Sequence, residues 1–260
     1  MREARILGMP VSLLAHDQVL QSVAERIQAR EPGGYISITN TESLYHARRR
    51  AALGRYIQNA QHSLCDGVGV VVAGWFWGHR IRRYTGPVFQ LDCTAAGVER
   101  GWRHFYYGGK EGVAEELARR LAARFPGTQC AGVYAPPFRE LTPEEDEQIV
   151  AMINRARPDI VWVGLGLPKQ EKWIADHIDR IEAPWMVGVG AAFDFHSGAV
   201  PWAPRAMRAA GLEWVFRLML EPRLRARRYW WSLLFVLEAA LHGMLRLLPG
   251  RTVRQTIEDA

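Results

Sequence analysis

A single stretch of this chain decides its fold: Pro158-Asp159-Ile160-Val161-Trp162-Val163-Gly164-Leu165-Gly166-Leu167-Pro168-Lys169-Gln170-Glu171-Lys172-Trp173. The β-branched and aromatic run at 160–163 predicts a strand that is buried on both faces. The glycines at 164 and 166 then predict a turn, and Pro168 is typical of the first turn of a helix. A strand, a glycine turn and a helix N-terminus in this order indicate an open parallel sheet.

The glycine turn predicts a binding site for an anion. In an open parallel sheet such a turn lies at the carboxyl ends of the strands, where glycines let a ligand touch the backbone. Free amides and the helix dipole favour negative charge there, so a nucleotide diphosphate would fit. The alternative is that Gly164 and Gly166 only make a tight connection. The long polar side chains of Lys169, Gln170 and Glu171 favour the binding site.

The same alternation of strands and helices extends outward from this stretch. Strands are expected at 6–14 (or a hairpin), 35–38, 103–107, 129–133, 160–163 and 185–189. The strand at 103–107 also ends in glycines, Gly108 and Gly109. Helical spacing predicts helices between the strands, and one further helix from Pro204 to Pro222. The sequence therefore predicts an α/β fold with a Rossmann-like, doubly wound, mostly parallel sheet.

The composition is that of one compact body. The chain has 260 residues, of which 48% are hydrophobic, so it can bury a large α/β core. Cys65, Cys93 and Cys130 form no C-x-x-C pair and predict neither a disulfide framework nor a zinc site. The first residues lack the pattern of a secretory signal peptide. We expect a core at 1–200, a basic, amphipathic helical appendage at 201–260, and a location in the cytoplasm.

Polar side chains follow two of the predicted strands, and one more carboxylate lies in an apolar run between them. Asp66 lies between apolar residues and beside glycines, and Asp194 follows the last strand. A carboxylate in apolar surroundings is costly unless it is paired. Asp66 is therefore either a general base with a shifted pKa or a structural cap of the next helix. Thr39 and Asn40 end another strand, either as a helix cap or as ligand contacts.

The C-terminal part of the chain is basic and largely apolar. Between Arg217 and Arg254 it carries eight arginines against two glutamates, as large an excess as the net charge of +6. The stretch at 229–248 is apolar except for one row at helical spacing, Glu238, His242 and Arg246. We expect a helix that lies on a membrane surface with this row in water, because a spanning helix would place Glu238 near its middle. The arginines suit anionic lipid rather than nucleic acid. The alternative is a helix packed on the core or on a second subunit.

Several motifs, taken together, resemble those of one enzyme family. They are Thr39-Asn40-Thr41-Glu42, Cys65-Asp66-Gly67-Val68-Gly69-Val70-Val71, Gly108-Gly109-Lys110, 164–173, Gly188-Val189-Gly190-Ala191-Ala192-Phe193-Asp194, 203–205, 211–218 and Glu221-Pro222-Arg223. This set, in order over nearly all of residues 1–228, resembles the WecG/TagA/CpsF glycosyltransferases, glycosyltransferase family 26.

The resemblance implies an inverting transfer, without a metal or other cofactor, from a UDP-sugar to a polyprenyl-diphosphate-linked saccharide. The enzyme would be a peripheral protein at the cytoplasmic face of the bacterial inner membrane, with homo-oligomers possible. Asp66 matches the position of the catalytic base, and Arg83 that of an arginine that stabilises the leaving diphosphate. The other matching positions are the polar pocket residues Thr39, Asn40 and Gln170, the nucleotide contact Asp194, and the tail arginines Arg217, Arg223 and Arg225 over the diphosphate.

One departure from the family pattern concerns substrate choice. Many relatives have an acidic residue soon after the R-x-x-G element, but here Arg83-Tyr84-Thr85-Gly86 is followed by Pro87-Val88. Together with the Trp- and Arg-rich tail, this favours an exopolysaccharide enzyme and leaves N-acetylmannosamine, its uronic acid and glucose open as donor sugars.

Two other functions compete with this one. A dinucleotide oxidoreductase is disfavoured because no G-x-G-x-x-G with a downstream acidic residue follows the first strand. The other is a non-catalytic scaffold that holds a polysaccharide-assembly complex at the membrane.

Overall fold

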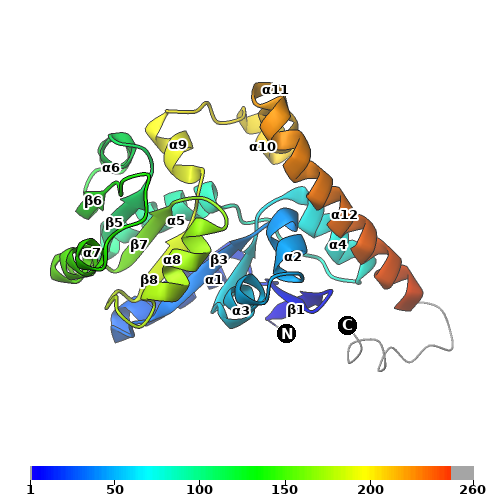
Figure 1. Cartoon of the computed structure of the whole chain (residues 1–260), viewed down its shortest axis with the longest axis horizontal. Coiled ribbons are helices and arrows are strands. Elements are labelled where there is room, and N and C mark those ends of the chain that lie inside the picture. Colours follow the sequence, from blue (N-terminus) through cyan, green and yellow to red (C-terminus); the bar gives the residue numbers. More distant parts are fainter. Residues whose placement is uncertain (1, 247–260) are drawn as a thin grey trace.

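A six-stranded parallel sheet forms the centre of the molecule, which is known from a computed structural model that describes residues 2–246 (Figure 1). The strands lie in the order β4-β3-β8-β7-β5-β6, and every pairing within this sheet is parallel. Their bounds are β3 Gly34–Thr39, β4 His62–Cys65, β5 Arg103–Gly108, β6 Gln129–Tyr134, β7 Ile160–Gly164 and β8 Trp185–Gly188. The predicted doubly wound α/β fold is therefore confirmed.

Helices cover both faces of this sheet. One face carries α1 (His16–Ala29), α5 (Gly86–Arg100), α6 (Val113–Arg124) and α9 (Ala192–Ser197). The other carries α2 (Thr41–Ala47), α3 (Ala51–Asn59), α7 (Pro143–Ala156) and α8 (Lys169–His177). The helices that follow the neighbouring strands β3 and β8 thus lie on opposite faces. Ligands of doubly wound folds bind where the chain leaves two neighbouring strands toward opposite faces, so the place to look for a site is the edge near Asn40 and Gly190.

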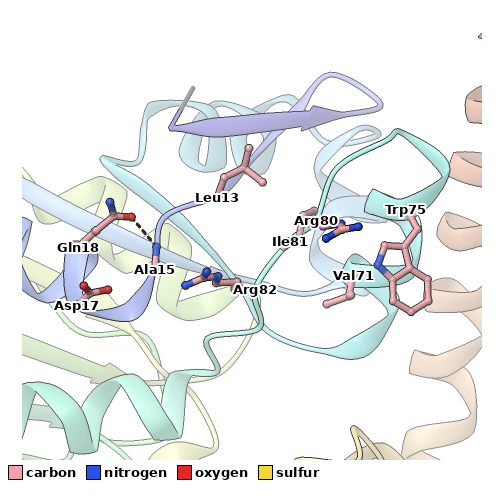
Figure 2. Close-up of a pocket in the computed structure, with 9 residues that line it drawn as sticks. All are labelled: Leu13, Ala15, Asp17, Gln18, Val71, Trp75, Arg80, Ile81 and Arg82. Atoms are coloured by element: carbon pink, nitrogen blue, oxygen red, sulfur yellow. Dashed lines mark hydrogen bonds between the residues drawn. The ribbon is translucent and has the colours of Figure 1, made fainter.

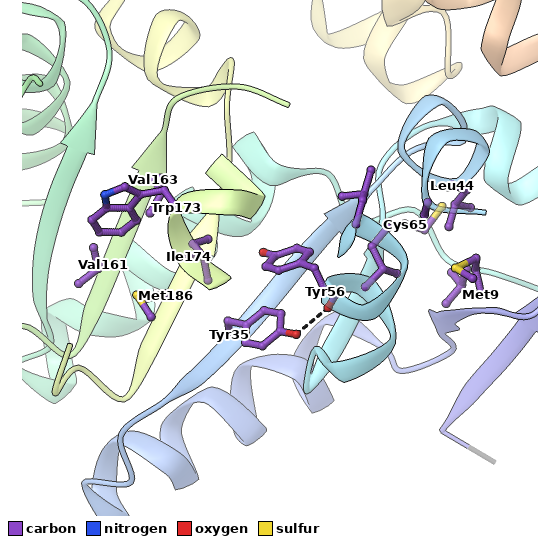
Figure 3. Close-up of a cluster of buried hydrophobic side chains, with 14 of the residues drawn as sticks. Met9, Tyr35, Leu44, Tyr56, Cys65, Val161, Val163, Trp173, Ile174 and Met186 are labelled. Carbon is purple, nitrogen blue, oxygen red and sulfur yellow. Dashed lines mark hydrogen bonds between the residues drawn. The ribbon is translucent and has the colours of Figure 1, made fainter. Parts of the chain in front are cut away.

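Side chains along each strand of the sheet point alternately into two hydrophobic cores, one on each face. Trp162 and Trp185 are fully buried against the α1 and α5 face. Val161 and Met186 point to the opposite face and pack with Trp173 of α8 (Figure 3). On this second face the Tyr35 hydroxyl donates a hydrogen bond of 2.6 Å to the backbone oxygen of Tyr56, which satisfies a polar group inside the core. Burial on both faces explains why the strands read as apolar runs without alternation.

A separate hairpin precedes the sheet, as the sequence predicts. It consists of β1 (Glu3–Ile6) and β2 (Met9–Ser12), joined through Gly8, whose φ of +83° a residue with a side chain rarely adopts. Helix α1 then begins at His16, with Ala15 as its N-cap. The side chain of Gln18, in the first turn of the helix, accepts a hydrogen bond of 2.9 Å from the Ala15 amide and so stabilises the helix N-terminus.

The segment after β8 differs from the single helix expected between Pro204 and Pro222. It forms two short helices, α10 (Arg205–Ala209) and α11 (Glu213–Leu220), separated at Gly211, whose φ is +75°. A left-handed residue ends a helix, so the break follows from Gly211. Pro222 is then the first residue of the long helix α12 (Pro222–Arg246).

Helix α12 packs on the core against α2 and α4 (Val68–Phe76) (Figure 1). Phe235 and Ala239 are completely buried there, and the Trp77 indole donates a hydrogen bond of 2.9 Å to the Ala239 backbone oxygen. Glu238 forms ion pairs with Arg48 and Arg49, which follow α2. The expectation that this polar row stays in water is therefore wrong for Glu238, because two arginines of the core draw its carboxylate inward, whereas His242 and Arg246 of the same row are exposed.

The outer face of α12 is apolar instead. Its exposed side chains are 47–57% accessible and recur every three or four residues, so they form one row along the helix: Trp230, Leu233, Leu237, Leu241 and Met244. Of the alternatives for this segment, packing on the core is confirmed. Leu247, Leu248, Arg251 and Arg254 lie outside the described residues, and the boundary at residue 200 stays a prediction.

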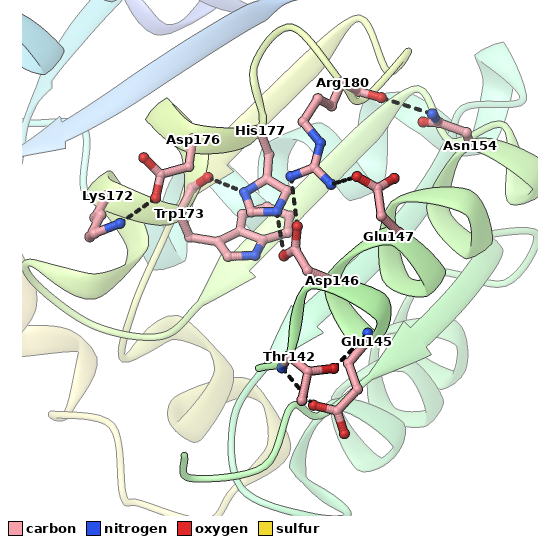
Figure 4. A network of polar contacts seen from close by, with 10 residues as sticks. All are labelled: Thr142, Glu145, Asp146, Glu147, Asn154, Lys172, Trp173, Asp176, His177 and Arg180. Atoms are coloured by element: carbon pink, nitrogen blue, oxygen red, sulfur yellow. Dashed lines mark hydrogen bonds and ion pairs between the residues drawn. The ribbon is translucent and has the colours of Figure 1, made fainter. Parts of the chain in front are cut away.

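A polar network fixes α8 to α7 (Figure 4). The Asp146 carboxylate accepts hydrogen bonds from His177 at 2.8 Å and Arg180 at 2.6 Å. The other ring nitrogen of His177 lies 2.7 Å from the Trp173 backbone oxygen. These contacts hold α8 in place, and with it the glycine turn that precedes the helix.

Candidate active site

Asp66 follows the last residue of β4 and lies at the carboxyl edge of the sheet. Its backbone amide donates a hydrogen bond of 2.8 Å to the Thr39 oxygen, which continues the pairing of β4 with β3. Gly67, with φ of +118°, is the N-cap of α4, and no side chain caps that helix. Asp66 is therefore not the helix cap that the sequence left open. No side-chain hydrogen bond to its carboxylate is made within residues 2–246.

The electrostatic surroundings raise the pKa of Asp66 to about 6. Burial is the main cause, since it disfavours the charged form, and the negative charge of Glu213 adds to it. Arg217, Arg83 and Arg228 act in the opposite direction. A carboxylate with this pKa is ionised near neutral pH but still accepts a proton readily, which is what a general base requires.

Arg83 is held beside Asp66 by the backbone. It forms an isolated parallel bridge with Cys65, and its own oxygen lies 3.1 Å from the His16 ring. Its guanidinium donates to the backbone oxygen of Arg208 at the end of α10. In this arrangement Arg83 ties α10 to the edge of β4. Its contact with a diphosphate stays a prediction.

Thr39 and Asn40 stand at the end of β3. The Thr39 hydroxyl is fully buried and bonds the Ser63 hydroxyl at 2.7 Å, so it supports the sheet beneath Asp66. Asn40 is the N-cap of α2: its side chain accepts from the Ser43 amide at 2.9 Å. The helix-cap alternative is thus confirmed for Asn40, and ligand contacts by either residue stay predictions.

The glycines after β5 and β7 serve packing more than ligand access. A Cβ on Gly164 would lie 2.6 Å from the Phe193 ring, and one on Gly109 would lie 3.0 Å from Val113. Gly166, with φ of +74°, has nothing within 4 Å of an added Cβ. The alternative of a tight connection therefore describes Gly164 and Gly109, and open space for a ligand remains at Gly166.

Gln170 is buried at the start of α8, against the end of β8. Its amide nitrogen would lie 2.8 Å from a Cβ on Gly188, and it donates a hydrogen bond of 3.0 Å to Glu171. The Gln170 oxygen and the second Glu171 oxygen have no partner among the described residues. Burial raises the pKa of Glu171 to about 7. Lys169 is exposed at the same turn.

Asp194, which follows β8, lies near arginines of the C-terminal tail. Burial raises the pKa of Asp194, whereas Lys110 and Arg217 counteract the rise through their positive charges. Arg217 is close enough to both Asp66 and Asp194 to influence both pKa values. Arg225 is buried and bonds Glu221 at 2.8 Å. Arg223 is exposed and makes no ion pair within the described part of the chain.

Sequence analysis gave no role to three charged residues that the structure places near this site. The negative charge of Glu213, the first residue of α11, raises the pKa of Asp66. Arg228 of α12 donates a hydrogen bond of 2.6 Å to Glu42 of α2, which joins the tail to the start of the core. Glu42 and Glu213 lie inside the motifs quoted above, but the sequence carries no signal for a pair 186 residues apart.

The arrangement as a whole combines one unpaired carboxylate with several cations at the carboxyl edge of a parallel sheet. Such a site can accept a proton at Asp66 and stabilise an anionic group beside it through Arg217 and Lys110. Among residues 2–246, no three His, Cys, Asp or Glu side chains are grouped so that they could hold a metal ion.

Comparisons with known proteins found one matching family model and several relatives. The model of the Glycosyl transferase WecG/TagA/CpsF family matches residues 4–248. Two relatives from Staphylococcus aureus, strains NCTC 8325 / PS 47 and COL, are each 30% identical over 192 residues, which is 72% of either chain. Both carry the name N-acetylglucosaminyldiphosphoundecaprenol N-acetyl-beta-D-mannosaminyltransferase.

Proposed function

This chain belongs to the WecG/TagA/CpsF family of glycosyl transferases, and we propose that it transfers a sugar from a UDP-sugar to a saccharide on polyprenyl diphosphate. The observation that carries the proposal is the unpaired Asp66 carboxylate, with a pKa of about 6, at the end of β4 and among arginines. The names of the Staphylococcus aureus relatives support the acceptor, since they specify N-acetylglucosaminyl diphosphoundecaprenol.

The proposed reaction is a single displacement at the anomeric carbon of the donor. A hydroxyl oxygen of the acceptor forms the new bond to this carbon while the bond to the UDP oxygen breaks, and UDP leaves with the electron pair. Asp66 takes the hydroxyl proton. One displacement inverts the configuration at the anomeric carbon, and a single base suffices for it.

The donor diphosphate fits the cationic side of the site. The glycine turn at Gly166 has open space, and the N-terminus of α8 follows it, where backbone amides favour an anion. Lys110 and Arg217 supply positive charge near Asp194. These groups stabilise the negative charge that develops on the leaving diphosphate without a metal ion, and Asp194 contacts the nucleotide.

The lipid-linked acceptor requires a protein that reaches the membrane. The exposed apolar row on α12, from Trp230 to Met244, is suited to lie in the interface of the bilayer. Exposed Arg223 and Arg227 at the start of the same helix suit anionic lipid head groups. Within the described part of the chain, no helix is long and apolar enough to cross a membrane. We place the protein on the cytoplasmic face, where nucleotide sugars are available.

The proposal is tested by UDP release from a donor panel. The panel contains UDP-linked N-acetylmannosamine, its uronic acid and glucose, each with and without a short-chain prenyl-diphosphate N-acetylglucosamine acceptor, in buffer with EDTA. We expect one donor to release UDP only when acceptor is present. The anomeric configuration of the product, read from the one-bond carbon–proton coupling at its anomeric carbon, should be opposite to that of the donor. Retained configuration would contradict the single displacement.

A further inference from the structure

A second cavity lies outside the site described above, at the edge of the molecule next to β4. It has a volume of about 700 Å³ and is bounded by α4, the start of α1 and the loop between α4 and α5 (Figure 2). Leu13, Val71 and Ile81 give it apolar walls. Nothing in the proposed donor site uses these residues, so the cavity needs an account of its own.

The lining of this cavity carries more positive than negative charge. Arg80 and Arg82 both line it, are exposed, and form no ion pair or side-chain hydrogen bond within residues 2–246. Figure 2 shows Arg82 between the α1 side, where Asp17 and Gln18 lie, and the α4 side. Two arginines against one carboxylate leave an excess of positive charge, and arginine is well suited to phosphate because its planar fork donates two hydrogen bonds.

The α4 side of the cavity is aromatic. Trp75 is 63% exposed and lies on the same side as Arg80, across from Arg82 (Figure 2). The next residue, Phe76, is exposed as well and packs on Gly243 of α12. The cavity therefore opens near α12. A ligand that combines an anionic group with an apolar chain matches this lining better than a purely polar ligand.

The position of the cavity relates it to Asp66. Arg82 directly precedes Arg83, which is bridged to Cys65, the neighbour of Asp66. With about 3.8 Å between consecutive Cα atoms and about 4.8 Å between strands, the Cα atoms of Arg82 and Asp66 are within roughly 13 Å. Val71 lies on the helix that Asp66 and Gly67 lead into. A molecule that occupies the cavity can therefore extend to the proposed base.

We propose that this cavity binds the diphosphate and the first isoprenyl units of the lipid-linked acceptor. The proposal rests on the proposed function, since it assigns the acceptor subsite of that reaction. Arg80 and Arg82 hold the diphosphate, and Trp75, Val71 and Leu13 contact the prenyl chain. The chain leaves toward the apolar face of α12, and the attached sugar reaches Asp66. The donor and acceptor phosphates then bind to different cationic groups, which lie on either side of Asp66.

Direct binding of farnesyl diphosphate to the full chain, in non-ionic detergent, tests the subsite without turnover. The Arg80→Ala/Arg82→Ala variant should bind it about tenfold or more weakly, because it loses two charge-assisted contacts. Trp75→Ala should also weaken binding. The control is Arg55→Ala/Arg155→Ala, which removes two exposed arginines without ion pairs elsewhere on the described surface. UDP binding should be the same in every variant.

Three results would overturn the proposal: unchanged farnesyl diphosphate binding in the Arg80/Arg82 variant, equal binding of inorganic diphosphate, or equal competition by phosphatidylglycerol micelles. The second would make the cavity a simple anion site, and the third a phospholipid site. In turnover, the same variant should raise the KM for acceptor and leave the KM for donor unchanged. If farnesyl diphosphate binds as expected but no donor releases UDP, the proposed function fails while the lipid-diphosphate site stands.

Discussion

Replacing Asp66 with Asn should abolish transfer and also stabilise the folded protein at pH 8. Asn has nearly the same shape but no charge, so the substitution removes the buried carboxylate and little else. An ordinary aspartate has a pKa of 3.8, and the folded protein raises this to about 6. Between these pH values the folded state holds a proton that the unfolded state has released, so stability falls as the pH rises.

The size of this effect follows from the pKa values. At 1.36 kcal/mol per pH unit, the rise from 3.8 to about 6 costs the folded state about 3 kcal/mol at pH 8, as an upper bound. At pH 5 Asp66 is mostly protonated in the folded state, and the same linkage gives about 1.6 kcal/mol. The gain from Asp66→Asn should therefore be about 1.4 kcal/mol larger at pH 8 than at pH 5.

Urea unfolding of both proteins at pH 5 and pH 8 measures this difference. Any pH-independent effect of the amide cancels when the two pH values are compared. Glu99→Gln controls for the loss of one surface carboxylate, since Glu99 is exposed and makes no ion pair among the described residues. A gain that is the same at both pH values, or a loss at pH 8, would refute the reasoning that Asp66 carries a raised pKa.

Four further outcomes are expected. Acceptor-dependent transfer should rise as the pH passes through about 6, and Glu213→Gln should move this rise to lower pH, because Glu213 helps to raise the pKa of Asp66; a rise at unchanged pH would contradict the role of Glu213. Phe235→Ala should lower the free energy of unfolding in urea by about 3–5 kcal/mol, since the ring is completely buried between α12 and the core. Leu237→Glu should prevent sedimentation with anionic vesicles at an unchanged melting temperature, and continued sedimentation would argue against the apolar row as the membrane contact. Asp146→Asn should cost about 1–3 kcal/mol in the same urea assay, as the carboxylate bonds both His177 and Arg180.

Most strands of the fold could be predicted because burial on both faces leaves a direct mark on the sequence, but β4 (His62–Cys65) was not among the expected strands. The run at 160–163 is strand β7, and the helices around it follow from spacing and turn residues. Asp66 could be singled out for the same reason, since a carboxylate among apolar residues needs an explanation. The residue types alone could not decide between a base and a helix cap. Only the structure shows that Gly67 caps α4.

Contacts between distant segments were beyond the sequence. A glycine at position 164 is compatible with a ligand contact as well as with a close packing partner, and the structure shows Phe193 packed against it, while the ligand contact stays a prediction. When α12 is considered alone, Glu238 belongs to a polar row that would be expected to face the solvent. It faces inward because Arg48 and Arg49 lie opposite, almost 200 residues earlier in the chain. Long-range pairing of charges thus set the orientation of the tail, and no local pattern encodes it.

Acceptor-dependent UDP release at pH 7.5 by the intact protein and by Asp66→Asn tests the central claim most directly. We expect rapid release from one donor by the intact protein. The variant should lose at least about a hundredfold of this rate, which is the lower end of what general base catalysis contributes. UDP binding should be the same in both. Equal release by the two proteins would show that Asp66 is not the base and would contradict the account.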